Sequence, residues 1–373
     1  MHPWSGRGRL PLASAPTCLL AAAIWAWSAS LTPAATPARQ RAIVQTGYGG
    51  PEVLQLQTVP VPAPAAGQVL IRIYAAAVNP EEWKEREVPA GGAASGGSRG
   101  ADLRRIPGRD AAGVIEKAGA GVTRFKVGDK VVAAASRDVP GLNGAYAEFA
   151  LALEGSVIAK PKTMSFEEAS GLGVAAMTAA HAVNQADIRS GMRVLVRGAG
   201  GGVGAAAAQM AKSRGAFVIG TAPGNRADYV RSLGVDEVVD YTRLRFEEVI
   251  RPVDAVIETS TAEPGTPDTA TRALQVLKRG GTLVSVARMP SDEACRAAGV
   301  NCIRSDREGL DATAEGRLLA QVGALADAGQ FRVVVVAAYP LEQAAAAQED
   351  NRRDSNVRSK IVIDVVPGEA KRR

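Results

Sequence analysis

A glycine-rich segment between a strand-like run and a helix-like run constrains the fold of this chain more than any other feature. Residues 194–212 read VLVRGAGGGVGAAAAQMAK, with apolar residues before the glycines and an alanine-rich stretch after them. Glycine permits positive φ angles and close backbone contact with a ligand, and the N–H groups of a helix N-terminus attract an anion. A strand, glycine turn and helix followed by another strand predict a βαβ unit that holds the pyrophosphate of a dinucleotide. The expected cradle consists of Ala199, Gly200, Gly201, Gly202, Val203 and Gly204.

The residues after the second strand of this unit indicate which dinucleotide is bound. A site for NAD usually ends that strand with Asp or Glu, which binds the ribose 2′-hydroxyl and repels a 2′-phosphate. The segment AFVIGTAPGNR (216–226) has no acid and offers Thr221, Asn225 and Arg226 instead. These hydrogen-bond donors and the positive charge favour NADP(H). Tyr241, at the end of the third predicted strand, either adds a hydroxyl at the adenosine end or is a rim aromatic.

Composition and charge restrict the remaining classes of function. The chain has 373 residues, of which 46% are hydrophobic and 22% charged, as in a soluble globular protein of two domains. The net charge is +6, but basic residues are mixed with acids, as in RLRFEEVIR (243–251). A clustered nucleic-acid-binding face is therefore not expected. With only Cys18, Cys295 and Cys302 there is no disulfide framework, although a single Cys295–Cys302 bridge can form; otherwise these two are structural or surface thiols.

Residues 1–40 differ from the rest of the chain. No Asp or Glu occurs before Glu52, the start MHPWSGRGR is basic, and CLLAAAIWAWSA (18–29) is apolar and is followed by small residues. This pattern is typical of a secretory signal peptide and is too short for a membrane span. An organellar transit peptide and a wrongly assigned start codon are the alternatives. If this segment is a true signal peptide, we expect an exported, periplasmic or membrane-anchored protein. If it is not, we expect a cytoplasmic protein.

The chain from residue 41 onward changes character twice. Residues 41–163 consist of short β segments separated by Gly and Pro, typical of a β-rich barrel or sandwich, with a loop at 89–102. Residues 164–329 alternate strands with helices, which predicts right-handed βαβ units and a parallel sheet. Within this part, SFEE (165–168) is a capping box and TATRALQVLKRGG (269–281) predicts a helix. Residues 330–367 return to strand and helix, and 368–373 form a basic tail.

Several further motifs occur in a fixed order along the chain. They are GYGGPEVL (47–54), AAAVNPEEWK (75–84), PGRDAAGVIEKAGAGVTRFKVGDKV (107–131), GAYAEF (144–149), AAMTAAHAV (175–183), SLGVDEVVDY (232–241), LKRGGTLVSV (277–286) and VRSKIVIDV (357–365). With the glycine loop, they resemble the zinc-independent medium-chain dehydrogenase/reductases, namely the NADPH:quinone oxidoreductase (zeta-crystallin-like) and enoyl reductase proteins. The resemblance implies an α/β fold in which a GroES-like β-rich catalytic domain is interrupted by a Rossmann domain with a doubly wound parallel sheet. Substrate and nicotinamide are then expected in the cleft between the two domains.

The resemblance also implies site residues. Asn79 and Lys84 are expected near the nicotinamide or the substrate. In the same cleft, we expect nearby N–H groups, together with Lys84 or Tyr146, to stabilise negative charge that develops on a substrate oxygen.

Other residues are expected to contact the cofactor. The resemblance places Thr178 at a helix start facing the cofactor, and the strand end at Val284 and Val286 beside the nicotinamide. Arg358 and Lys360 match a C-terminal motif of the family that approaches the cofactor phosphates.

Three departures from the family pattern concern the shape of the cleft: Ser359 replaces a glycine, Ala180 an aromatic residue and Glu82 an aspartate. Arg109 stands where the alcohol-dehydrogenase branch has a histidine zinc ligand, and no cysteine occurs near Asn79. A catalytic zinc needs about three N or S ligands around an open position, and outside the first segment the chain has only His181, Cys295 and Cys302 as soft ligands. No metal site is therefore expected.

Without a metal, the chemistry must come from the nicotinamide. We expect NADPH-dependent hydride transfer to a quinone or an α,β-unsaturated carbonyl compound. His181 is interpreted as a helix residue without a catalytic role. The alternatives are a non-catalytic NADPH-binding redox sensor or structural protein of the same fold, and a reductase module of lipid or polyketide assembly. The expected partners are a small-molecule substrate and, from the resemblance, a second copy in a homodimer.

Overall fold

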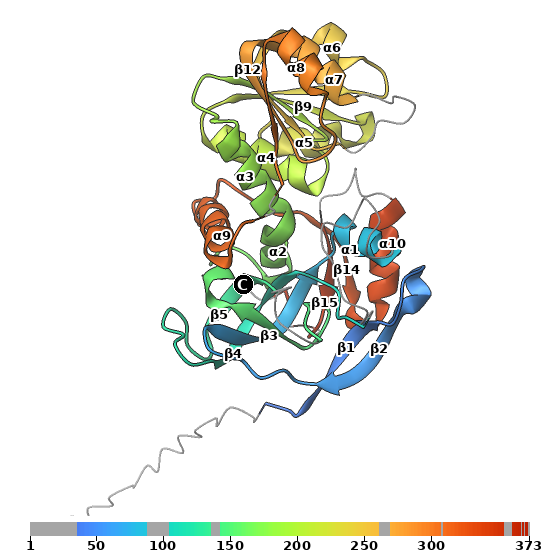
Figure 1. Ribbon diagram of the computed structural model, residues 1–373, viewed down its shortest axis with the longest axis vertical. Helices are drawn as coiled ribbons and strands as arrows, with labels where there is room; N and C mark the ends of the chain where they lie inside the picture. Colours follow the sequence, from blue (N-terminus) through green and yellow to red (C-terminus); the bar gives the residue numbers. More distant parts are fainter. Residues whose placement is uncertain are drawn as a thin grey trace, which may run out of the picture. The chain divides into compact units, whose positions relative to one another are not determined.

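The computed structural model describes residues 36–87, 104–135, 142–260, 269–306, 309–353, 360–366, 368 and 370–371, and those from Pro37 onward belong to one compact unit (Figure 1). Several predictions fall outside these residues. They concern the signal-like segment through residue 35, nearly all of the loop at 89–102, Arg358 and most of the basic tail.

One sheet has six parallel strands in the order β10-β9-β8-β11-β12-β13. The strands are β8 (Arg193–Arg197), β9 (Phe217–Ala222), β10 (Glu237–Asp240), β11 (Val253–Glu258), β12 (Leu277–Ser285) and β13 (Asn301–Arg304). The order reverses between β8 and β11, and ligands of such sheets bind outside the carboxyl ends of the strands at this switch point. The predicted Rossmann-type parallel sheet is confirmed.

Helices cover both faces of this sheet because its strands are apolar on both sides. The face with Val194 and Val196 packs with α3 (Met177–Gln185), α4 (Gly202–Ser213) and α5 (Ala227–Ser232). The opposite face, with Leu195, packs with α6 (Phe246–Val249), α7 (Thr269–Ala273) and α8 (Asp292–Ala298) (Figure 1). The sheet is therefore doubly wound.

The predicted helix over 269–281 is wrong beyond its first half. Helix α7 ends at Ala273, a single 3-10 turn covers Leu274–Val276, and β12 begins at Leu277, which pairs with Val253 of β11. Gly280 has a φ of 75°, which a helix does not allow. The two consecutive glycines therefore favour a bend within an extended segment over another helical turn.

The second sheet is largely antiparallel and has the order β14-β15-β3-β4-β5-β7, with β6 also pairing with β3. Its strands are β3 (Gln68–Ala77), β4 (Asp110–Ala118), β5 (Lys130–Ala134), β6 (Phe149–Leu153), β7 (Val157–Ala159), β14 (Val335–Pro340) and β15 (Lys360–Asp364). A separate two-stranded ribbon consists of β1 (Arg39–Gln45) and β2 (Leu54–Pro60), and its Ala42 forms an isolated bridge with Ala147, just before β6. The C-terminal β14 and β15 thus complete a sheet of N-terminal strands, as the GroES-like prediction requires.

The remaining helices lie around this second sheet: α1 (Pro80–Glu87), α2 (Phe166–Ser170), α9 (Ala312–Asp327) and α10 (Ala344–Arg353). The predicted capping box is confirmed, because Ser165 Oγ accepts from the N–H of Glu168 while Glu168 accepts from the N–H of Ser165. Helix α9 was not identified from the sequence. One buried cluster includes residues of both sheets, such as Val132 and Val194, so the two sheets share a core.

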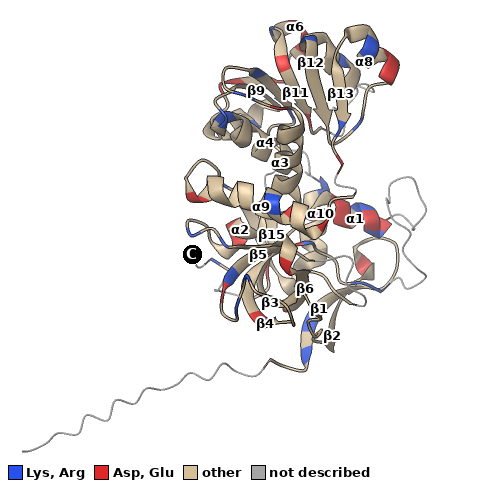
Figure 2. Cartoon of the chain, turned by 60° about the vertical axis from the view of Figure 1, so that its left-hand side comes forward, with Lys and Arg blue, Asp and Glu red and all other residues tan. Residues whose placement is uncertain are grey.

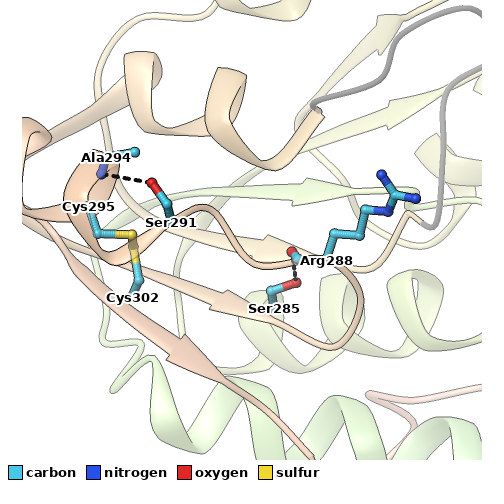
Figure 3. Close-up of a disulfide and its surroundings, with 6 residues drawn as sticks. All are labelled: Ser285, Arg288, Ser291, Ala294, Cys295 and Cys302. Atoms are coloured by element: carbon cyan, nitrogen blue, oxygen red, sulfur yellow. Dashed lines mark hydrogen bonds between the residues drawn. A yellow bond between two sulfur atoms is a disulfide. The ribbon is translucent and has the colours of Figure 1, made fainter. Parts of the chain in front are cut away.

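Cys295 and Cys302 form the disulfide that the sequence allowed, and it joins α8 to the edge strand β13 (Figure 3). Ser291 caps α8 next to it, with its Oγ accepting from the N–H of Ala294 at 3.1 Å. No helix in the described part of the chain is both long enough and apolar enough to span a bilayer.

Candidate active site

A cavity of about 270 Å³ opens at the carboxyl ends of β8, β9, β11 and β12 and extends to α1 and β15. Its position is the switch point of the parallel sheet. Its lining falls into three groups, which are the glycine loop, the ends of the other three strands, and a polar group from the second sheet. The residues come from segments far apart in the sequence, so only the fold brings them together.

The glycine loop forms one wall. Gly200, Gly201, Gly202, Val203 and Gly204 line the cavity, and Ala199 lies fully buried beneath them. A Cβ at Gly204 would lie 2.1 Å from the carbonyl oxygen of Gly198, so only glycine lets α4 approach β8 this closely. No side chain among the described residues caps α4 at Gly201. The first N–H groups of α4 can therefore serve an anion from the cavity.

The end of β9 forms a second part of the lining. Thr221 lines the cavity, and its Oγ1 accepts from the N–H of Gly198 at 3.1 Å. Tyr241 also lines the cavity, whereas Asn225 and Arg226 lie in the following 3-10 turn outside its lining.

Sequence reasoning missed an acid beside this turn. Asp240 lies at the end of β10 and accepts a hydrogen bond from Thr242 Oγ1 at 2.6 Å. This bond, with hydrogen bonds from the backbone N–H groups of Thr242 and Gly224, lowers the pKa of Asp240. Strand β9 thus ends without an acid, whereas the neighbouring strand β10 ends with one, and its carboxylate accepts hydrogen bonds from nearby residues of the chain.

Asn79 is the centre of the polar group from the second sheet. Its Nδ2 donates to Asp110 Oδ2 at 2.9 Å, and its Oδ1 accepts from Lys360 Nζ at 2.8 Å. Asp110 Oδ1 accepts from the N–H of Val174 at 2.7 Å. Because a carboxylate only accepts and an ammonium only donates, the Asn79 amide has a single orientation. Asp110 was not identified from the sequence, since nothing local marks its partners.

Lys360 and Asn79 line the same cavity as the glycine loop. The resemblance implied that Lys360 approaches the cofactor phosphates. In the structure its ammonium lies against Asn79, and its Nζ is 3.6 Å from Asp110 Oδ2. Gly173 makes room for this arrangement, because a Cβ there would lie 2.0 Å from Asp110 Oδ1.

Tyr146 does not line the cavity. It is fully buried, and its hydroxyl donates to Glu82 Oε2 at 2.5 Å. The same oxygen accepts from the N–H of Asn79 at 3.0 Å. Burial raises the pKa of Glu82 to about 8 and holds the pKa of Tyr146 well above its usual value. We expected Tyr146 in the cleft, and the structure places it outside the cavity lining, linked to Asn79 through Glu82.

Lys84 lines the cavity from α1, which is held firmly against α10. The fully buried Arg86 donates to Gln348 Oε1 and Glu349 Oε1, both at 2.8 Å, and Trp83 Nε1 donates to Asn351 Oδ1 at 3.0 Å. Figure 2 shows acidic and basic residues mixed along both helices. These contacts fix the backbone from which Lys84 extends.

Of the other residues expected at the cofactor, some line the cavity and others do not. Val286 lines the cavity, whereas Val284 is buried within the sheet. Thr178 does not line the cavity. Its hydroxyl donates to the carbonyl oxygen of Val174, and Val174 is a lining residue. Arg358 lies outside the described residues.

The described residues include no group of three or more His, Cys, Asp or Glu side chains that could hold a metal. Arg109, which the resemblance places where the alcohol-dehydrogenase branch has a histidine, forms an ion pair with Glu315 at 2.9 Å.

Comparison with known proteins connects this geometry to a family. Residues 65–162 match the family described as alcohol dehydrogenase GroES-like domain, and residues 233–363 match the one described as zinc-binding dehydrogenase. The quinone oxidoreductase of Rattus norvegicus is 34% identical, over 87% of this chain and 97% of its own length. The 2-methylene-furan-3-one reductase of Solanum lycopersicum is 35% identical, over 74% of this chain and 68% of its own. The solved structure of the quinone oxidoreductase from Coxiella burnetii is 29% identical and superposes with a TM-score of 0.74. The match covers 88% of this chain and 100% of that chain.

Proposed function

Because this chain belongs to the quinone oxidoreductase family of medium-chain dehydrogenase/reductases, we propose that it uses NADPH to reduce a quinone or an α,β-unsaturated carbonyl compound without a metal ion. The chain is an oxidoreductase of that family, and its Rossmann-type sheet implies a nicotinamide cofactor. The observation that carries the proposal is the shared cavity, in which the glycine loop and the Asn79–Lys360 pair face one space.

The residues of the cavity fit a dinucleotide. The N-terminus of α4 offers N–H groups to a pyrophosphate, and Gly204 permits the close packing that this requires. When bound, the nicotinamide supplies the hydride. The protein holds the reacting partners in place.

Three observations support NADP(H) over NAD(H). The end of β9 carries no acid, and Arg226 brings a positive charge to the turn that follows it. Thr221 accepts from Gly198, so its hydroxyl hydrogen can be donated to a phosphate oxygen.

The polar group from the second sheet has a defined role in this proposal. Asn79 has one N–H left after its bond to Asp110, and Lys360 adds a positive charge beside it. Together with Lys84 at the cavity lining, they stabilise negative charge on the substrate oxygen. Water then protonates the product, so no protein proton donor is required.

The proposal is tested with the purified full chain, by following NADPH oxidation with quinones and enones as acceptors and NADH as the control cofactor. We expect turnover with NADPH at a much lower KM than with NADH. Tight NADPH binding without turnover on any acceptor would instead favour the non-catalytic sensor or structural role.

Export is a further proposal. The Cys295–Cys302 disulfide supports it, because disulfides persist mainly in oxidising compartments, and so does the signal-like segment before residue 41. Sequencing of the mature N-terminus from the native source tests it. The proposed homodimer is supported by the family resemblance, and light scattering of the purified protein tests it.

A further inference from the structure

We propose that Glu258 is a positioning residue, which turns the hydroxyl of Ser260 so that, beside the hydroxyl of Thr259, it accepts a hydrogen bond from the ribose next to the nicotinamide. This inference rests on the proposed binding of a nicotinamide dinucleotide. Thr259 and Ser260 follow β11 directly, and both line the cavity.

Glu258 is 1% exposed, and both of its carboxylate oxygens are occupied. Oε1 accepts from the backbone N–H of Ser260 at 2.8 Å and from its Oγ at 2.6 Å. Oε2 accepts from Arg197 Nη1 at 2.8 Å. A serine hydroxyl has one hydrogen, and here that hydrogen points to the protein. Ser260 can therefore offer only lone pairs to a ligand.

The hydroxyl of Thr259 is also turned toward the protein, here by a backbone carbonyl group and not by Glu258. Thr259 Oγ1 donates to the carbonyl oxygen of Arg197 at 2.6 Å. The adjacent hydroxyls of Thr259 and Ser260 thus offer only hydrogen-bond acceptors to the cavity, and we call this pair of residues the acceptor wall. The N-terminus of α4, starting at Gly202, presents N–H donors to the same cavity. The cavity therefore offers acceptors along one part of its lining and donors along another.

The order of the strands decides which half of the dinucleotide meets the acceptor wall. Strands β9 and β10 lie on one side of β8, while β11 and β12 lie on the other. The adenosine half of a dinucleotide lies over the former pair, and the nicotinamide half over the latter. Next to the pyrophosphate, the hydrogen-bond donors of the nicotinamide half are its ribose hydroxyls. These are the groups that Thr259 and Ser260 are placed to accept from.

The buried charge pair beneath the wall explains how the geometry is held. Arg197 ends β8, is fully buried, and its guanidinium lies 4.4 Å from the centre of the Phe246 ring. A buried ion pair adds little net stability, but removing one partner leaves an uncompensated charge. The pair with Glu258 therefore serves mainly to hold the segment after β11 in one conformation.

The test measures dissociation constants for three probes. NADPH and 2′-phospho-ADP-ribose carry the second ribose, whereas adenosine 2′,5′-diphosphate lacks it. We expect Glu258→Gln to weaken the first two about 10-fold, through the loss of charge-assisted positioning, and to leave the third within about 2-fold. Ser260→Ala, which keeps the buried charge pair, should show the same pattern with a loss of about 5-fold.

Glu247→Gln is the matched control. Glu247 forms an ion pair with Arg272 at 2.7 Å, and the Arg272 guanidinium lies 5.0 Å from the same Phe246 ring, but Glu247 does not line the cavity. This variant should bind all three probes like the wild type.

Two outcomes overturn the inference. One is unchanged NADPH affinity in Ser260→Ala, which decides the matter even if Glu258→Gln does not fold. The other is an equal loss for all three probes, which indicates general damage to the cavity. Failure of the proposed function itself looks different, because the wild type would then bind neither NADPH nor adenosine 2′,5′-diphosphate.

Discussion

Asn79 donates to Asp110 across 2.9 Å within a buried group that also holds Lys360, and this contact sets the orientation of the amide at the cavity. We expect Asp110→Asn to lower kcat about 10- to 100-fold, because an amide at this position no longer fixes Asn79. The KM for NADPH should change much less. Asp254→Asn is the control, since Asp254 also accepts from a backbone N–H and a lysine but lies outside the cavity lining. Steady-state kinetics of both variants check this, and equal losses in the two would contradict it.

The buried Glu82 predicts a specific dependence of stability on pH. Its pKa is about 8 in the folded protein and 4.5 for the ordinary side chain, so the folded state binds more protons between these values. The stabilisation is complete below pH 4.5 and is lost as the pH rises through 8, by at most about 1.4 kcal/mol per pH unit.

Glu82→Gln removes this titration. The free energy of unfolding of the variant should fall less steeply than that of the wild type from pH 5 to 9, so its relative stability should increase over this range. Urea unfolding at pH 5, 7 and 9 measures the difference. Parallel pH profiles for the two proteins would show that Glu82 is ionised throughout.

Coenzyme preference is expected to depend on Arg226. Arg226→Ala should raise the KM for NADPH about 5- to 10-fold, through loss of a charge near the 2′-phosphate, and leave that for NADH unchanged. Arg231→Ala is the control, because Arg231 lies on the next helix and forms an ion pair with Asp228. A parallel change in both KM values for Arg226→Ala would rule out a contact with the phosphate.

The Cys295–Cys302 bridge is expected to stabilise the folded chain. It closes a loop with a sequence separation of 7 residues, for which loop-closure entropy gives about 2 kcal/mol. The double variant Cys295→Ala/Cys302→Ala should lose about this much in urea unfolding. Reduced wild-type protein should unfold at a urea concentration close to that of the variant. If reduction has no effect on the wild type, the bridge does not form in solution.

Sequence reasoning worked where the physical signal is local. The glycine loop, the alternating strands and the Ser165–Glu168 capping box each carry their own pattern within a few residues, and the structure contains all three. The helix predicted over 269–281 failed because strand pairing with β11 outweighs the helical pattern of the same residues.

The site was harder to predict because its contacts are not local. Asp110 bonds to Asn79 across 31 positions, and Tyr146 bonds to Glu82 across 64. Glu258 pairs with Arg197 across 61 positions. Burial of such groups can be recognised only after the fold has placed their partners.

The central claim is that NADPH is oxidised in this cavity without a metal. The most direct test is the initial rate of NADPH oxidation with a quinone acceptor, measured by absorbance at about 340 nm before and after exhaustive treatment with a chelator. We predict the same rate in both samples, because the nicotinamide supplies the hydride and the described residues include no group of three or more His, Cys, Asp or Glu side chains suited to hold a metal. A rate that disappears on chelation and returns when zinc is added would contradict the account.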